Sequence, residues 1–495
     1  MSIPIEQYRR EIEEKYIGFK PNTEKVKPVH IANGMFRSIL GKTADTREIN
    51  RFVIYMSQRG TSGVNTSDAL YEDLVENNKI TRLTISKEQV AEMRRILKKV
   101  VAADDGVFTN GMESYSAAFE GFVSRDRIAQ DGGEFVGTWL SQQGTSRQML
   151  GECIGSSLRE SGDIITVLMS PLLNHTRNDY TPPEYSSVIL RASNIPNEVD
   201  NLWKELSTAA NTLSKHLSSH PNKLVRMQSA VLFSCYVLVR HLACLENYHV
   251  NGCHRGILPF LIDFSTSSQD AVARASTMTY TLICQSISRF YAWAFAEKLR
   301  LDFNSINEVL KEPTPTYSQG SQANRQRDLR EMDEIWRTAQ IEARNIVASN
   351  SGDPFEPLGQ AIYDLMLLKA NASPIQYLRQ LGRKIGLLWP PNQPVRRFRI
   401  QQELLEVLIR GAVEPGEPIN LNSLQDRLWD RYGIIIGGRL SDEERLLNNG
   451  IYQADSDALK ENCTRFVECL NNLSFARLMA DGVLMIKLEG YGNES

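Results

Sequence analysis

The sequence predicts a mainly α-helical protein with several domains, and three observations support this fold class. Two long stretches, 222–246 and 269–301, carry apolar residues at helical spacing. The second stretch is apolar on most faces and includes Trp293, as is typical of a helix in the centre of a bundle. The chain has 495 residues, and because a single core stops growing at roughly 250–300 residues, we expect more than one domain.

Composition and charge narrow the class of protein. Hydrophobic residues make up 42% and charged residues 23% of the chain, which is an ordinary globular balance. The net charge of -3 provides no general attraction for nucleic acid, so any such contact must be local or must come through a partner. The first twenty residues lack the apolar core of a signal peptide, and no apolar run reaches the roughly 20 residues of a membrane span. Seven cysteines without regular spacing argue against a disulfide framework. We therefore expect a cytoplasmic protein without membrane contact.

The pattern divides into three expected domains. Residues 1–165 form a mixed, mostly helical domain, with glycines and serines concentrated over 103–163 that predict turns and close backbone contacts. Residues 166–390 form a helical core domain, in which the polar, aperiodic stretch 312–328 predicts a linker or mobile loop. Three prolines between 390 and 394 cannot continue a helix, so we place the boundary to a third domain, 395–495, at this point.

Helices in the first two domains follow from apolar faces and their end signals. The charged segment 7–16 predicts a short helix, and 87–101 combines an apolar face with a basic one. Asn197 can cap a helix that runs to 217, and Pro221 precedes the helix of 222–246. The segments 269–301, 329–348 and 357–370 complete the helical core.

The third domain has the clearest pattern. We expect helices at 396–412, at 422–432 with Gly433 after its end, and at 457–473, with a short β segment at 434–436 followed by a polar insertion. Asp481-Gly482 lies between two alternating apolar runs in 475–489, which predicts a β-hairpin. This order of three helices and a terminal hairpin resembles the winged helix-turn-helix family over about 95 residues. The resemblance implies a winged-helix-like (α plus β-hairpin) module, which binds DNA in many members and assembles proteins in many others.

The charges of this module favour docking over direct DNA reading. The helix from Asp457, which corresponds to the recognition helix, carries three acidic side chains against Lys460 and Arg465. A denser basic group lies upstream, at the start of the module. The candidate nucleic-acid contacts are therefore Arg383, Lys384, Arg396, Arg397, Arg399, Lys460 and Arg465. The other interpretation of the upstream group is a solvated helix start.

One cluster has the side chains that zinc prefers: His241, Cys244, His249, Cys253 and His254. Its spacing is irregular and the chain contains no Cys-x-x-Cys, so a helix end with a buried Cys244 is the favoured interpretation. Gly41-Lys42-Thr43 lacks the preceding glycine of a P-loop, and Asp263 is expected to cap near Ser265. We predict no cofactor, with zinc as the alternative.

These observations favour a non-enzymatic subunit of a prokaryotic nucleic-acid-handling complex. Its helical body would bind other protein subunits, such as an ATPase or a nuclease, and the C-terminal module would contact DNA or a partner. In architecture the chain resembles helical subunits of multi-gene bacterial phage-defence systems, which implies an antiviral role. Two alternatives stay open: an enzyme with its site in the glycine-rich N-terminal region or at the His/Cys cluster 241–254, and a scaffold that binds no nucleic acid.

Overall fold

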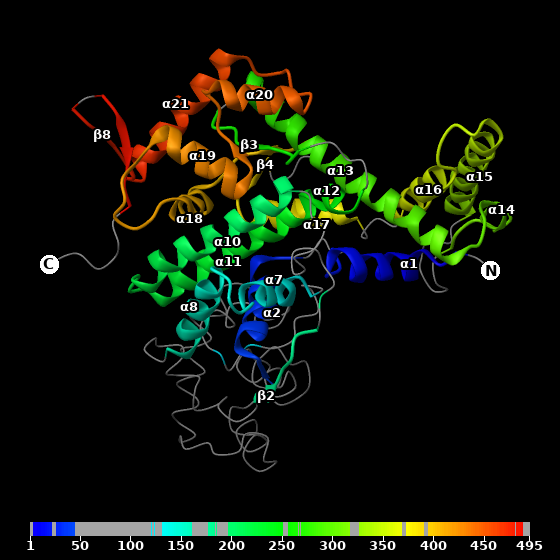
Figure 1. Cartoon of the computed structure of the whole chain (residues 1–495), viewed down its shortest axis with the longest axis horizontal. Helices are drawn as coiled ribbons and strands as arrows, with labels where there is room; N and C mark the ends of the chain where they lie inside the picture. The colour runs from blue at the N-terminus through cyan, green and yellow to red at the C-terminus, as the bar shows by residue number, and fades with distance from the viewer. Residues whose placement is uncertain are drawn as a thin grey trace, which may run out of the picture.

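The computed structural model confirms a mainly helical fold with small β-sheets (Figure 1). It describes residues 3–21, 26–44, 120, 123, 131–160, 177–183, 185, 197–250, 256–265, 267, 269–316, 326–368, 373–390, 395–480 and 482–488. The predicted helix 87–101 and most of the loop 312–328 lie outside these residues.

The helices of the described residues are α1 (Ile5–Ile12), which continues as the π-helix η1 (Glu13–Ile17), α2 (Pro28–Leu40), α7 (Gly132–Leu140), α8 (Gln148–Arg159), α10 (Asn197–Ser218), α11 (Lys223–Ala243), α12 (Leu245–His249), α13 (Ala271–Asp302), α14 (Ile306–Val309), α15 (Gln326–Ser349), α16 (Phe355–Leu367), α17 (Pro374–Lys384), α18 (Gln402–Ala412), α19 (Leu421–Tyr432), α20 (Leu440–Asn448) and α21 (Ser456–Asn472). The strands are β1 (Lys42–Ala44), β2 (Arg177–Asp179), β3 (Phe260–Leu261), β4 (Leu388–Trp389), β5 (Arg397–Phe398), β6 (Ile419–Asn420), β7 (Ile434–Ile435), β8 (Ala476–Leu478) and β9 (Leu484–Ile486).

The long helix α13 is the centre of the helical body, as its apolar sequence predicts. Phe290 and Tyr291 are fully buried, and α13 packs against α1, α11, α12 and α16. Gly359 of α16 allows this close packing, because a Cβ atom there would lie 2.3 Å from the backbone oxygen of Ala292. Trp293 differs from the expectation: it is only partly buried, and its ring stacks on His249. The helices α14, α15 and α16 lie at one end of the longest axis and the strand β8 at the other (Figure 1).

Glycines in the N-terminal part serve helix packing. The helices α2 and α7 approach so closely that a Cβ atom at Gly133 would lie 2.3 Å from the backbone oxygen of Ile31. A buried ion pair of 2.5 Å between Arg37 and Glu134 joins the same two helices. Gly41 ends α2 with a φ of 62°, and Lys42 lies in β1, so this segment is a helix end and a strand rather than a phosphate-binding loop.

The extended segment 258–265 connects the helical body to the C-terminal part. Its strand β3 pairs in parallel with β7, through hydrogen bonds from Phe260 to Gly433 and from Ile262 to Ile435. Asp263 is fully buried: one carboxylate oxygen accepts a hydrogen bond of 2.8 Å from the Ser265 backbone, and the other lies 2.7 Å from Nε of Arg397. The expected bond near Ser265 is therefore present, but it lies in an extended segment and caps no helix, since α13 begins at Ala271.

Asn462 of α21 closes the same junction. Its side-chain nitrogen donates to the backbone oxygens of Ile262 and Ile436, at 2.8 Å each, and its side-chain oxygen accepts from the Phe264 backbone. Because every polar atom of this amide has a buried partner, the position of α21 relative to β3 and β7 is fixed.

The C-terminal part contains the expected helices and hairpin with two differences. The first helix, α18, begins at Gln402 rather than 396, because Arg397 and Phe398 form β5, which pairs with β4. The polar insertion contains α20. The strands β6, β9 and β8 form an antiparallel sheet in that order, and Gly482 of the hairpin has a φ of 81°. Asp481 lies outside the described residues.

The three expected domains share one continuous hydrophobic core in the described residues. This core includes side chains from Ile3 to Leu488, and α10 packs against both α18 and α19. The domain boundaries at 165 and 390–395 therefore stay predictions.

Glu13 is a buried acid at the junction of α1 and η1. Its carboxylate lies 3.7 Å from Nε of Arg9 and accepts a long hydrogen bond of 3.4 Å from the hydroxyl of Tyr291. Burial raises the pKa of Glu13 to about 7, because desolvation of the charged form outweighs the attraction of Arg9.

We predict that Glu13 makes the protein less stable as the pH rises. The folded state binds the Glu13 proton more tightly than the unfolded state, so its contribution is present below pH 4.5 and is lost as the pH rises through about 7. Glu13→Gln should match the wild type at pH 4 and exceed its free energy of unfolding at pH 8 by about 1–3 kcal/mol. Denaturant unfolding at both pH values measures this, with the exposed Glu14→Gln as control. An equal difference at both pH values would contradict the prediction.

We predict that loss of Arg397 destabilises the fold because it leaves the Asp263 carboxylate buried and unpaired. Arg397→Met should lower the free energy of unfolding by about 3–5 kcal/mol. The double variant with Asp263→Asn should recover most of this loss, because asparagine can still accept the Ser265 hydrogen bond. Urea denaturation of the two single variants and the double variant measures the coupling. Additive effects would show that the pair is not the source of the loss.

Candidate functional site

The basic residues of α21 are neutralised by neighbouring acids. Arg465 contacts Asp270 at 3.1 Å and Glu461 at 2.5 Å, and Lys460 lies 3.5 Å from Asp457. The exposed face of this helix carries Asp457, Lys460, Glu461, Thr464 and Glu468. A helix surface with more acids than bases repels a phosphate backbone.

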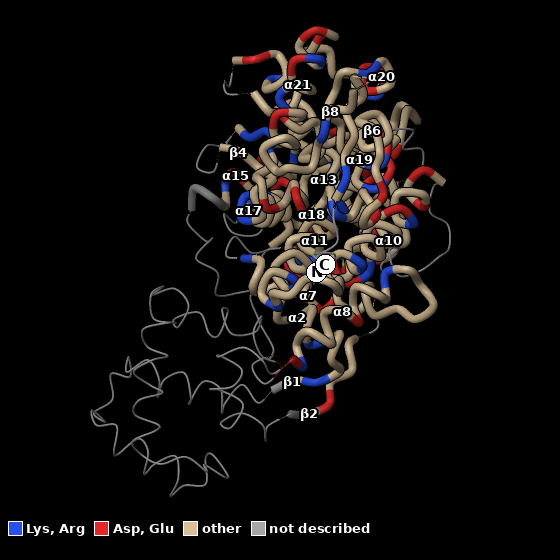
Figure 2. Tube along the Cα trace, turned by 90° about the vertical axis from the view of Figure 1, so that its left-hand side faces the viewer, with Lys and Arg blue, Asp and Glu red and all other residues tan. Residues whose placement is uncertain are grey.

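The upstream basic group is divided among different surroundings. Arg397 is buried in its ion pair with Asp263 and is therefore withdrawn from surface contact. The guanidinium of Arg399 lies over the Trp389 ring, 5.6 Å from its centroid, and Lys384 is exposed at the end of α17. Arg396 is buried and Arg383 partly exposed. Figure 2 shows basic and acidic segments interspersed along the described chain. The seven candidate nucleic-acid contacts, all of which the structure describes, therefore form no continuous basic strip.

The hairpin of β8 and β9 exposes an apolar tip. Leu478, Met479 and Val483 are 68%, 48% and 42% exposed, and β8 projects from the body at the end of the long axis (Figure 1). The buried face of the hairpin is held by Ile486. Apolar side chains gathered on a projecting element are typical of a surface that a partner covers.

The histidines of the His/Cys cluster are core residues. Nε2 of His241 donates to the backbone oxygen of Ile17 at 2.9 Å, and Nε2 of His249 donates to that of Tyr16 at 3.2 Å. Burial lowers the pKa of His241 to about 3 and that of His249 to about 4, so both rings are neutral. Cys244 is buried, and burial raises the pKa of its thiol.

A zinc site at this cluster finds no support in the described residues. Among them, no group of three or more histidine, cysteine, aspartate or glutamate side chains is arranged to hold a metal ion. The engagement of both Nε2 atoms with backbone oxygens explains why His241 and His249 do not converge on an ion. Cys253 and His254 lie outside the described residues.

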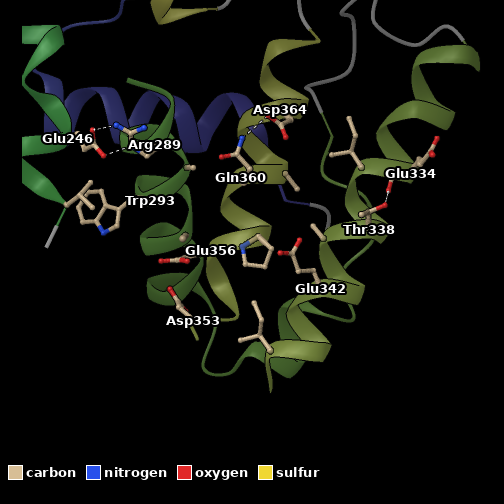
Figure 3. Close-up of a pocket in the computed structure, with 18 of the residues that line it drawn as sticks. Glu246, Arg289, Trp293, Glu334, Thr338, Glu342, Asp353, Glu356, Gln360 and Asp364 are labelled. Carbon is tan, nitrogen blue, oxygen red and sulfur yellow. Dashed lines mark hydrogen bonds and ion pairs between the residues drawn. The ribbon is translucent and has the colours of Figure 1, made fainter. Parts of the chain in front are cut away.

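A cavity of about 820 Å³ lies between α13, α15 and α16 (Figure 3). Its apolar surface includes Trp293, Ile335, Ala339, Ile346 and Pro357. Its acidic side chains are Glu246, Glu331, Glu334, Glu342, Asp353, Glu356 and Asp364. An apolar surface beside many carboxylates suits a ligand that combines alkyl groups with positive charge.

Two of these acids have basic partners. Glu246 forms a bidentate ion pair with Arg289, shown by dashed lines in Figure 3, and Asp353 pairs with Arg300. Burial raises the pKa of Asp364. Glu331, Glu334, Glu342 and Glu356 form no ion pair with a basic side chain of the residues that the structure describes. The cavity therefore has a negative potential that is open to solvent.

The spacing of acidic residues in the sequence indicates one side of this cavity. Glu331, Glu334, Thr338 and Glu342 recur at intervals of three and four residues, which places them on one face of α15. The partner face of α16 could not be assigned, because its relation to α15 depends on tertiary packing. Arg379 was missed in the same way, although it lies one helical turn before Arg383 on α17.

Within the described ranges, no helix has both the length and the apolar composition that crossing a bilayer requires. No family model and no curated protein sequence matches this chain.

Proposed function

We propose that this protein is a non-enzymatic docking subunit of a prokaryotic nucleic-acid-handling complex, working in the cytoplasm and possessing a winged-helix-like C-terminal module. The order of the elements supports the resemblance of this module to winged helices. The order is α18, β6, α19, α21, β8 and β9, with β7 and α20 as an insertion. The sheet order β6-β9-β8 places the first strand beside the last, as a wing formed by β8 and β9 requires. A role in phage defence remains part of this proposal.

The observation that carries the proposal is the apolar tip of the hairpin. Leu478, Met479 and Val483 expose much of their apolar surface at the end of a projecting element. Burying such side chains against another protein is favourable by about 25 cal/mol per Å². A hairpin tip that contacts DNA would instead carry basic or polar side chains.

Charge supports a protein partner over direct DNA contact by this module. The exposed face of α21 is acidic, and both of its bases are paired. Contact with nucleic acid would then be made by another subunit, such as an ATPase or a nuclease. The test for direct contact is a mobility-shift series over salt concentration with Lys384→Glu/Arg399→Glu, because substitution of Arg397 would disrupt the core.

We predict that Leu478→Ser/Met479→Ser/Val483→Ser releases the partner without loss of folding. The three side chains are exposed, so the melting temperature should stay within a few degrees of the wild type. Native purification from the source cells, followed by mass spectrometry, should identify partners that the wild type retains and the variant loses. Leu440→Ser is the matched control, because Leu440 of α20 is 72% exposed and lies outside the hairpin. Equal recovery with the variant would remove the hairpin from the interface.

A second docking role is favoured by the acidic cavity. Its volume and its four glutamates without an ion pair to a described basic side chain suit a lysine-rich segment of a partner. The alkyl chains would lie against Ile335 and Ala339, and the ammonium groups near the carboxylates. The helices α15 and α16, which line the cavity, lie at the opposite end of the long axis from β8, so both surfaces can be occupied together (Figure 1).

We predict that the chain binds a fluorescent decalysine peptide and that Glu334→Gln/Glu342→Gln weakens this binding by at least about fivefold at low salt. Binding by the wild type should fall steeply between about 50 and 300 mM salt, because exposed charges are screened. Fluorescence anisotropy measures both effects. Glu403→Gln/Glu468→Gln removes the same charge away from the cavity and should bind like the wild type. Equal weakening in both double variants would indicate general charge attraction.

A further inference from the structure

Three arginines come together beside α17. Arg379 and Arg383 lie one turn apart on this helix, and Nε of Arg379 donates a 2.7 Å hydrogen bond to the hydroxyl of Tyr280 on α13. Arg396 directly precedes β5, whose Phe398 packs edge-on against the Tyr280 ring at 6.0 Å. Tyr280 therefore contacts both α17, which carries Arg379 and Arg383, and β5, which follows Arg396.

Arg396 is nine-tenths buried, with 9% exposure, yet two of its three guanidinium nitrogens have no hydrogen-bond partner among the described residues. Within the described ranges, these atoms are Nε and Nη1, and Nε of Arg383 also lacks an acceptor there. Nη2 of Arg383 donates a hydrogen bond of 3.0 Å to the side-chain oxygen of Gln380 on the same helix. None of the three arginines forms an ion pair with an acid in the part of the chain that the structure describes.

This arrangement is electrostatically unfavourable without an anion. Burial lowers the pKa of Arg396, and the positive charges of Arg379 and Arg383 add to this effect, whereas the nearby Tyr280 hydroxyl opposes it. Buried cations in folded proteins are ordinarily paired, because an unpaired one loses its hydration without compensation. The next residue, Arg397, is also buried, but it forms an ion pair with Asp263.

We propose that Arg379, Arg383 and Arg396 form a binding site for the phosphate group of a small phosphorylated ligand. Guanidinium groups match phosphate oxygens in bidentate geometry, and three of them can neutralise a dianion. Arg396 would be the floor of the site, and the partly exposed Arg379 and Arg383 its rim. A terminal phosphate monoester suits a group of one buried and two partly exposed arginines. A polynucleotide backbone would require a row of exposed cations, and Arg397 and Arg399 do not provide one.

This site is independent of the docking function proposed above. It uses none of the residues of the hairpin or of the acidic cavity. Ligand binding by the isolated full chain tests it, whereas docking is tested by the proteins that co-purify, so either proposal can fail alone.

Calorimetric titration of the full chain with AMP and with inorganic phosphate, at constant ionic strength, tests the proposal. We expect saturable binding of both. Arg396→Gln should weaken it by at least about tenfold, the loss of one charge-assisted contact, and Arg379→Gln and Arg383→Gln should each weaken it about three- to tenfold. Lys311→Gln, which removes an exposed positive charge outside α17, should leave the affinity unchanged. If Arg396→Gln does not fold, the two α17 variants decide the question.

Several outcomes would overturn the proposal. Absence of binding, or equal affinity in all variants, would exclude the three arginines. Equal affinity for phosphate, sulfate and chloride would indicate an adventitious ion only. Tighter binding of a single-stranded oligonucleotide without terminal phosphates, lost in the arginine variants, would assign the group to a nucleic-acid backbone instead.

Discussion

The buried ion pair between Asp263 and Arg397 lies at the centre of the contacts on which the rest of the structure depends. The segment around Asp263 is extended and pairs with only the short strand β7 among the described residues, so its backbone polar groups need partners from distant parts of the chain. Gly433 and Ile435 supply acceptors for Phe260 and Ile262, and Asn462 supplies a side chain. Phe398 accepts from the backbone of Asp263 and stacks on Phe260 at 4.5 Å. Helical body and C-terminal part are thereby joined through the core rather than at their surfaces.

This junction also determines which charges remain available at the surface. A basic run such as Arg396, Arg397 and Arg399 resembles a ligand-binding patch in the sequence, but the pairing of β5 with β4 sends neighbouring residues into different surroundings. Arg397 is buried in its ion pair with Asp263, and the guanidinium of Arg399 lies over the Trp389 ring. Arg396 lies near Arg379 and Arg383 of α17. Four glutamates of α15 and α16 without a basic partner among the described residues line the cavity, which gives it a local negative charge.

Local patterns predicted most of the helices and little of what joins them. The helical periodicity of 197–217, 222–246 and 269–301 corresponds to α10, α11 and α13, and the glycine at 482 correctly indicated the hairpin, because both signals depend on near neighbours. The start of α18 was wrong, since β5 exists only through pairing with β4 and contact with Phe260. The sequence did not predict the arginine group beside Tyr280 or the acidic cavity for the same reason. Each is assembled from separate elements by tertiary packing.

The parallel pairing of β3 with β7 has a consequence for synthesis of the chain. A ribosome that has produced the whole helical body has not yet made Gly433 or Ile435, so the amides of Phe260 and Ile262 still lack their acceptors. Until then the apolar segment 258–262 of the nascent chain lacks its strand partner. Apolar segments of this kind are surfaces that chaperones recognise. Folding is completed only after the last quarter of the polypeptide leaves the exit tunnel, and a premature stop codon in that quarter would leave the earlier helices without their final core.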